Sequence, residues 1–238
     1  MFGAGGDLYG WTPPAEPVKL QTKSGEDVLA LAFLGEQRLV VARGGPVLHD
    51  VNELQVLRRS SPLRWEQEAR AVLREKPACL AVDPDRELLA LGGASGGVRL
   101  FSADGLEDRG TLSGQHHVDP IAGPVAHLGR VTCLRFSADG RVVYTGSGSD
   151  GSVGKGTFGK RSEISSWRVS DRKQLDCRAL GRDPQDDEIG LRYLADFDAY
   201  GPADEVLLLV FRGQTGGVKG QQIELWWRDA LFPNAKAQ

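Results

Sequence analysis

A short pattern of strands and tight turns recurs four times along this 238-residue chain. Each copy opens with an apolar run, and these runs begin near residues 27, 78, 131 and 190. Apolar runs of about four to eight residues, separated by glycine, aspartate or proline, are typical of β-strands joined by turns. A repeating unit of this kind cannot bury its apolar face alone, so neighbouring copies must stack to share a core. The repeat therefore predicts an all-β fold.

The second and third copies align residue by residue. Residues 78–85 (ACLAVDPD) align with residues 132–139 (TCLRFSAD). The third strands align as well, with VRLF at residues 98–101, ISSW at 164–167 and IELW at 223–226. The copies are spaced more widely than the roughly 40–45 residues of a propeller repeat, and each excess coincides with an insertion.

The third copy, residues 125–171, carries a characteristic set of side chains. His127 precedes its first strand, Thr145 lies in its second strand, Asp150 lies in the following turn, and Trp167 closes its third strand. This set resembles the signature of the WD40-repeat β-propeller family. In that family the four side chains form a hydrogen-bonded network inside one blade, where a buried aspartate must be paired. The resemblance implies that His127, Thr145, Asp150 and Trp167 stabilise a blade and do not form a catalytic site.

The resemblance covers about residues 16–230, and it departs from the family pattern in several places. Ala126 stands where the family has a glycine before the histidine, and Arg168 follows the tryptophan where the family has an aspartate. Copies one and four keep little of the signature. The resemblance implies that the protein is not an enzyme. It also implies no cofactor-binding or metal-binding residues.

We expect a WD40-like β-propeller of about four blades in one domain, residues 16–232, between an irregular tail at residues 1–15 and a C-terminal tail at residues 233–238. The last copy has no fourth strand, and an isolated strand at Val18–Thr22 precedes the first copy. This N-terminal strand can complete the last blade and close the ring, which removes two exposed edges. Alternatively, the blades form an open arc that another chain completes, or a degenerate further blade lies between the copies.

Residues 62–75 interrupt the strand pattern and predict one short helix. Ser61 can cap a helix, and Pro62 suits its first turn. Trp65, Ala69, Val72 and Leu73 then fall on one face at helical spacing. Such a helix either lies on the flank of the β-domain or docks another subunit.

The composition excludes several classes of protein. The net charge is −3, so no electrostatic footprint for nucleic acid is present. The sequence shows no basic and apolar leader segment and no apolar run of membrane-spanning length. Its three cysteines form no CxxC pair, which favours buried free thiols in a reducing compartment. We therefore expect an intracellular, most simply cytoplasmic, protein without membrane insertion.

These features predict a non-enzymatic scaffold that holds one or more proteins in a multi-subunit assembly. Rigid sheets suit this role because their loops can vary without disturbing the core. The alternatives are an accessory or regulatory subunit of an enzyme complex and, from another class, a propeller enzyme or small-ligand binder that uses a central channel. Five aromatic or basic residues are candidate partner contacts: Trp11, Trp65, Lys155, Lys160 and Arg161.

Overall fold

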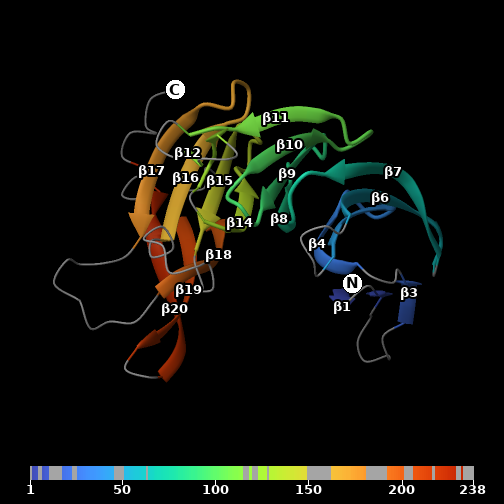
Figure 1. The fold of residues 1–238 in the computed structure, drawn as a ribbon, viewed down its shortest axis with the longest axis horizontal. Coiled ribbons are helices and arrows are strands. Elements are labelled where there is room, and N and C mark those ends of the chain that lie inside the picture. Colours follow the sequence, from blue (N-terminus) through green and yellow to red (C-terminus); the bar gives the residue numbers. More distant parts are fainter. Residues whose placement is uncertain are drawn as a thin grey trace.

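The fold is an arc of β-sheets (Figure 1). The computed structural model describes residues 2–4, 7–10, 18–22, 26–45, 51–62, 64–114, 118–119, 123–127, 129–148, 162–180, 192–200, 206–215, 218–228 and 232. Within these ranges every element with described bounds is a strand. The prediction of an all-β chain is confirmed.

Three sheets have four antiparallel strands each, and their strands follow one another in space as in sequence. We call these sheets blades one, two and three. Their strands are β4 (Asp27–Phe33), β5 (Arg38–Gly44), β6 (Asn52–Ser61) and β7 (Arg64–Leu73) in blade one, β8 (Pro77–Val82), β9 (Leu88–Gly93), β10 (Val98–Ser102) and β11 (Asp108–Leu112) in blade two, and β14 (Val131–Phe136), β15 (Val142–Ser147), β16 (Ser162–Arg168) and β17 (Gln174–Leu180) in blade three.

Two three-stranded sheets lie at the ends of the arc. The N-terminal sheet contains β1 (Phe2–Ala4), β2 (Asp7–Gly10) and β3 (Val18–Thr22). Blade four contains β18 (Arg192–Tyr200), β19 (Val206–Thr215) and β20 (Val218–Trp227). A small hairpin of β12 (Val118–Asp119) and β13 (Gly123–Pro124) lies between blades two and three in sequence.

Successive blades pack through their first strands. β4 contacts β8, β8 contacts β14, and β14 contacts β18, so the first strands line the inner side of the arc. The N-terminal sheet packs against β4 and β7 of blade one. Figure 1 shows the N-terminal sheet and blade four at opposite ends of this arc.

Each interface between blades has its own apolar core, because alternate residues of a strand point to opposite faces of its sheet. In β9, for example, Leu89 and Leu91 face blade one, while Ala90 faces blade three. One core joins blades one and two, a second joins blades two and three, and a third joins blades three and four. A fourth cluster, which includes Leu8, joins the N-terminal sheet to blade one.

The predicted helix at residues 62–75 is wrong, because this segment contains β7, the fourth strand of blade one. Ala69, Ala71 and Leu73 alternate onto the core between blades one and two, and Val72 between them is 68% exposed. An irregularity in the β6–β7 register beside Val56 then places Trp65 in the cluster of the N-terminal sheet. This change of face produced the apparent helical spacing.

The N-terminal strand Val18–Thr22 does not complete blade four. It is β3, which pairs with β2 in the N-terminal sheet at the other end of the arc. Residues 2–4 and 7–10, expected in an irregular tail, form β1 and β2. These strands cover Leu39 and Val41 of blade one, whose burial stabilises the end of the arc.

No helix in the part of the chain that the structure describes combines the length and the apolar character needed to cross a bilayer.

Candidate functional site

A chain of buried polar side chains links the loop before β14 to β15 and β16. The Trp167 indole donates a hydrogen bond from Nε1 to Thr145 Oγ1 over 2.8 Å. His127 Nε2 lies 2.7 Å from the same hydroxyl oxygen. His127 Nδ1 lies 3.4 Å from Glu163 Oε2. Because a carboxylate only accepts hydrogen bonds, this last contact places the imidazole proton on Nδ1, and Nε2 can accept from Thr145.

The position of this network favours a structural role. His127, Thr145 and Trp167 are each fully buried. A catalytic hydroxyl must reach a substrate, and the Thr145 hydroxyl is held between two side chains inside the blade. Asp150, the fourth residue of the predicted set, lies outside the described residues. Sequence reasoning missed Glu163, which stands at the start of β16 and faces His127 of the loop before β14.

The backbone around His127 also ties blade three to blade two. The His127 amide donates a hydrogen bond to the Gly96 carbonyl over 3.1 Å. Gly96 lies in the turn between β9 and β10 with φ +93°, and a Cβ there would lie 2.0 Å from the His127 carbonyl oxygen. Only glycine combines this conformation with this approach. His127 is therefore fixed by both of the blades that it joins.

A second buried polar cluster lies in blade one, on strands β5, β6 and β7. Arg43 of β5 and Glu53 of β6 are cross-strand partners, and both are buried. Arg70 Nε lies 2.6 Å from Glu53 Oε2. Burial lowers the pKa of Arg43, and the charges of Glu53, Glu26 and Asp7 oppose this effect. Since Asp7 lies on β2, the N-terminal sheet adds to the negative charge near Arg43.

The three cysteines are free thiols. Burial raises the pKa of Cys79 to about 12, and burial likewise raises the pKa of Cys133 and Cys177. Cys79 and Cys133 lie at equivalent positions in the first strands of blades two and three. A thiol with a raised pKa is a poor nucleophile, and Cys79 and Cys133 pack as small apolar side chains in the cores between blades.

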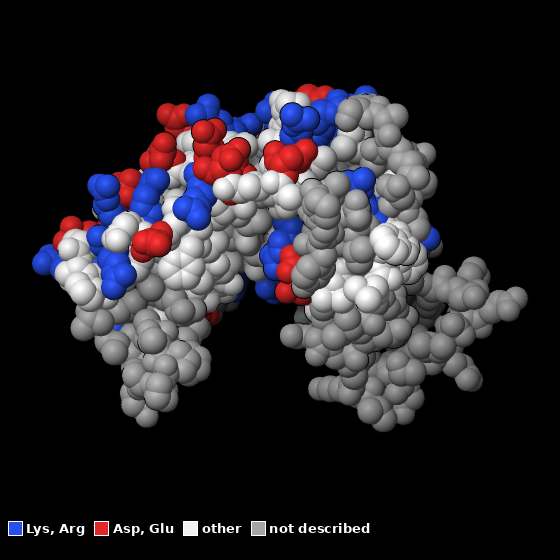
Figure 2. All heavy atoms as spheres, turned by 180° about the vertical axis from the view of Figure 1, so that it is seen from behind, with Lys and Arg blue, Asp and Glu red and all other residues white. Residues whose placement is uncertain are grey.

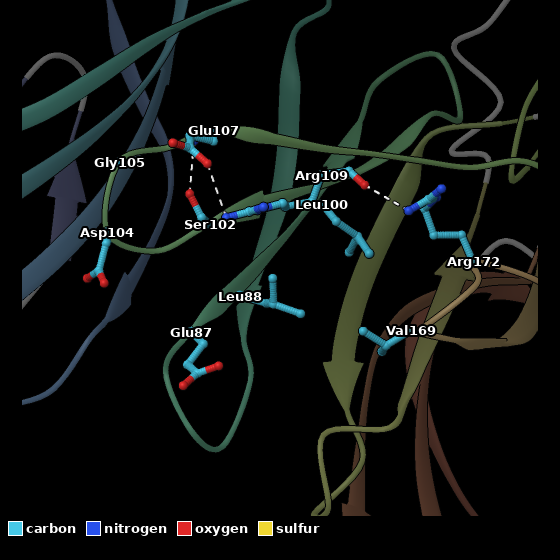
Figure 3. Close-up of a pocket in the computed structure, with 10 residues that line it drawn as sticks. All are labelled: Glu87, Leu88, Leu100, Ser102, Asp104, Gly105, Glu107, Arg109, Val169 and Arg172. Atoms are coloured by element: carbon cyan, nitrogen blue, oxygen red, sulfur yellow. Dashed lines mark hydrogen bonds and ion pairs between the residues drawn. The ribbon is translucent and has the colours of Figure 1, made fainter.

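A pocket of about 550 Å³ lies where the β10–β11 turn of blade two approaches the β16–β17 turn of blade three (Figure 3). Its charged groups are largely paired with one another or with neighbours. Glu107 lies 3.1 Å from Arg109, Asp104 lies 2.9 Å from Arg38, and Arg172 donates to the Arg109 carbonyl. We assign it no ligand. It is lined by Glu87, Leu88, Leu100, Ser102, Asp104, Gly105, Glu107, Arg109, Val169 and Arg172.

The predicted partner contacts are not brought together by the described structure. Trp65 packs in part against the cluster that contains Leu39 and Leu57, so it supports the N-terminal end of the arc. The other four lie outside the described residues: Trp11, Lys155, Lys160 and Arg161. Among the described residues, no group of three or more histidine, cysteine, aspartate or glutamate side chains is placed to hold a metal ion.

The geometry of blade three agrees with a known family pattern. Residues 120–154 match the family model described as the WD domain, G-beta repeat. The chain carries a WD40 repeat. The match spans the loop with His127, the β14–β15 hairpin and the segment with Asp150. Blades one and two repeat the four-stranded antiparallel order of this WD40 blade, and blade four repeats its first three strands.

Proposed function

We propose that this WD40 protein is a non-enzymatic scaffold that binds other proteins as a subunit of a larger assembly. The proposal rests on one observation. The sheet that contains the matched WD40 repeat is one of several antiparallel sheets with the same strand order, and these sheets pack side by side in one arc. WD40 repeats are generally used to build interaction surfaces. The blades bury both faces of their inner strands in shared cores, which leaves turns and outer strands to meet partners.

The buried network of blade three supports a structural reading over a catalytic one. His127 and Thr145 have the residue types of a hydrolytic site, but their polar atoms face each other and Trp167 inside the blade. Completion of the arc by another chain, rather than by the N-terminal strand, belongs to the same proposal, since β3 is already paired.

Protein partners fit the surface better than nucleic acid does. The net charge of the chain is −3. Figure 2 shows Lys and Arg interspersed with Asp and Glu on the described part of one face, without a continuous basic stripe there. The free cysteines fit an intracellular, reducing compartment, which is part of the proposal.

The test is purification of the tagged full-length protein from its own cells, with chemical cross-linking and mass spectrometry. We expect at least one protein in stoichiometric amount, with cross-links to residues of the blades, and none with the tag alone. If that partner is an enzyme whose rate depends on the bound chain, the accessory-subunit alternative holds. A protein that runs as a monomer with no stoichiometric partner contradicts the proposal.

A further inference from the structure

β20, the last strand of blade four, exposes two large apolar side chains on one face. Leu225 is 71% exposed and Trp227 is 66% exposed. Trp226 between them faces blade three, where the Arg178 guanidinium lies 5.1 Å from its ring centroid. Since side chains alternate along a strand, Leu225 and Trp227 face away from blade three.

The same position is buried in the two preceding blades. Leu100 of β10 and Ser166 of β16 align with Leu225, and they are 2% and 1% exposed. Leu100 packs in the core between blades two and three. The face that carries Leu225 is thus the face that a following β-sheet covers elsewhere in this molecule. On blade four it is uncovered in the described part of the chain.

Blade four also has an open strand edge. In the three complete blades the fourth strand ends on a buried leucine, which pairs with the first residue of the third strand. These leucines are Leu73, Leu112 and Leu180. β20 pairs with β19 along its whole length, and among the described strands none pairs with its other edge. An open edge offers a row of backbone donors and acceptors to an added strand.

The described parts of this chain do not supply that strand. β1, β2 and β3 form their own sheet at the far end of the arc. After β20 the chain turns, with the Phe232 amide donating to the Arg228 carbonyl over 2.7 Å. Phe232 then stacks on Tyr144 of blade three, with ring centroids 5.8 Å apart. The chain thus turns toward blade three.

A second copy of the chain is a poorer occupant than a different protein. Every described strand already belongs to a sheet, so a copy would have to release one of its own strands to fill the position. An extended segment of another protein has no such cost beyond its own ordering. Strand addition of this kind gains affinity from main-chain hydrogen bonds and specificity from alternate side chains.

We propose that an extended segment of a partner protein pairs with β20 as the fourth strand of blade four. Its alternate side chains are apolar and lie directly beside Leu225 and Trp227, as cross-strand neighbours do. The proposal rests on the proposed scaffold function, because it names the surface and the kind of partner. It gives blade four the four-strand order of the other three blades.

The probe for this test is a peptide with the sequence of β7, residues 64–73, which has the ten-residue length of β20. Hydrogen exchange of the full-length protein is followed with and without the peptide. At about ten times its dissociation constant, we expect exchange in residues 218–227 to slow about tenfold. A scrambled peptide should have no effect. The double variant Leu225→Asp with Trp227→Asp should lose the protection, whereas Val72→Asp, at an equally exposed apolar position of a complete blade, should keep it.

Three results of the exchange experiment would overturn the proposal. One is unchanged exchange in β20 at saturating peptide. Another is equal protection of the outer strands β7, β11 and β17, which indicates unspecific edge pairing. The third is protection of β20 that grows with protein concentration alone, which indicates a second copy. If the double variant keeps all partners of the purified complex, this proposal fails and the scaffold function stands. If the peptide binds β20 but no partner co-purifies, the scaffold function fails instead.

Discussion

Trp167 donates its indole hydrogen bond to Thr145 across the β15–β16 pair, over 2.8 Å, at a point where neither side chain reaches solvent. The same Thr145 oxygen lies 2.7 Å from His127 Nε2. One hydroxyl therefore connects the loop before β14 to the second and third strands of blade three.

Replacement of Thr145 by valine tests this connection. The Thr145→Val variant keeps the shape of the side chain but leaves the indole N–H and the imidazole without this partner. Burial of an unsatisfied polar group costs about 1–3 kcal/mol, so we expect a loss of about 2–3 kcal/mol in the free energy of unfolding by urea. Thr111→Val, at an exposed position of β11, should change it by less than about 0.5 kcal/mol. Equal effects of the two changes would contradict the proposed role of Thr145.

The close approach of Gly96 to His127 gives a second prediction. Gly96→Ala forces a Cβ against the His127 carbonyl oxygen at φ +93°, so we expect a destabilisation of more than about 2 kcal/mol. Gly129→Ala is the matched control, because a Cβ at Gly129 meets no atom within 4 Å. Thermal unfolding followed by circular dichroism measures both. A Gly96→Ala protein as stable as the Gly129→Ala protein would show that the turn is not held as described.

The buried Glu53 gives a third prediction. Glu53→Gln removes the charge that faces buried Arg43 and half-exposed Arg70. Loss of one partner from a buried ion pair costs about 3–5 kcal/mol, so a decrease of about 3 kcal/mol in unfolding free energy is expected. Glu68→Gln removes a partner of Arg38 at a part-exposed position and should cost about 1 kcal/mol or less. A smaller loss for Glu53 than for Glu68 would argue against a stabilising buried ion pair of Glu53 with Arg43 and Arg70.

Cysteine reactivity gives a prediction with a defined pH dependence. The Cys79 thiol is neutral below its pKa of about 12, so at pH 8 about one molecule in ten thousand carries the thiolate. We expect Cys79 and Cys133 to resist alkylation in the folded protein, with Cys79 reactivity rising about tenfold per pH unit below pH 12. All three cysteines should react at once in denaturant. Mass spectrometry of the labelled peptides measures this, and rapid labelling of Cys79 at pH 8 would refute its burial.

The sequence predicted the repeated sheets because their inner strands are strongly patterned. Cys79-Leu80-Ala81-Val82 and Cys133-Leu134-Arg135-Phe136 occupy equivalent positions, because both belong to the first strand of a blade. His127, Thr145 and Trp167 were identified by the same reasoning, since their spacing resembled a family signature. Their hydrogen bonds follow from that spacing once the strands pair.

Other features depend on pairings that no local pattern shows. The bulge beside Val56 moves Trp65 to the other face of β7 and gives a strand the apolar spacing of a helix. The N-terminal strand Val18–Thr22 carries no mark of its partner, and its place beside β2 depends on contacts far along the chain. Arg43 and Glu53 look like surface charges in sequence, yet both are buried, with Arg43 on the same face of β5 as Leu39 and Val41, which cluster with Leu8 of the N-terminal sheet.

The central claim is that the described strands form an arc of WD40-like blades in which no described strand pairs with the outer edge of β20. Residue-resolved hydrogen exchange of the free, full-length protein tests it most directly. In an antiparallel pair alternate amides point to opposite edges. We therefore expect every second amide of β20 to exchange rapidly, while the amides of β10 and β16, which are paired on both edges, exchange slowly. Uniform slow exchange along β20 in a monomer would mean that the chain completes its own last blade and would contradict the claim.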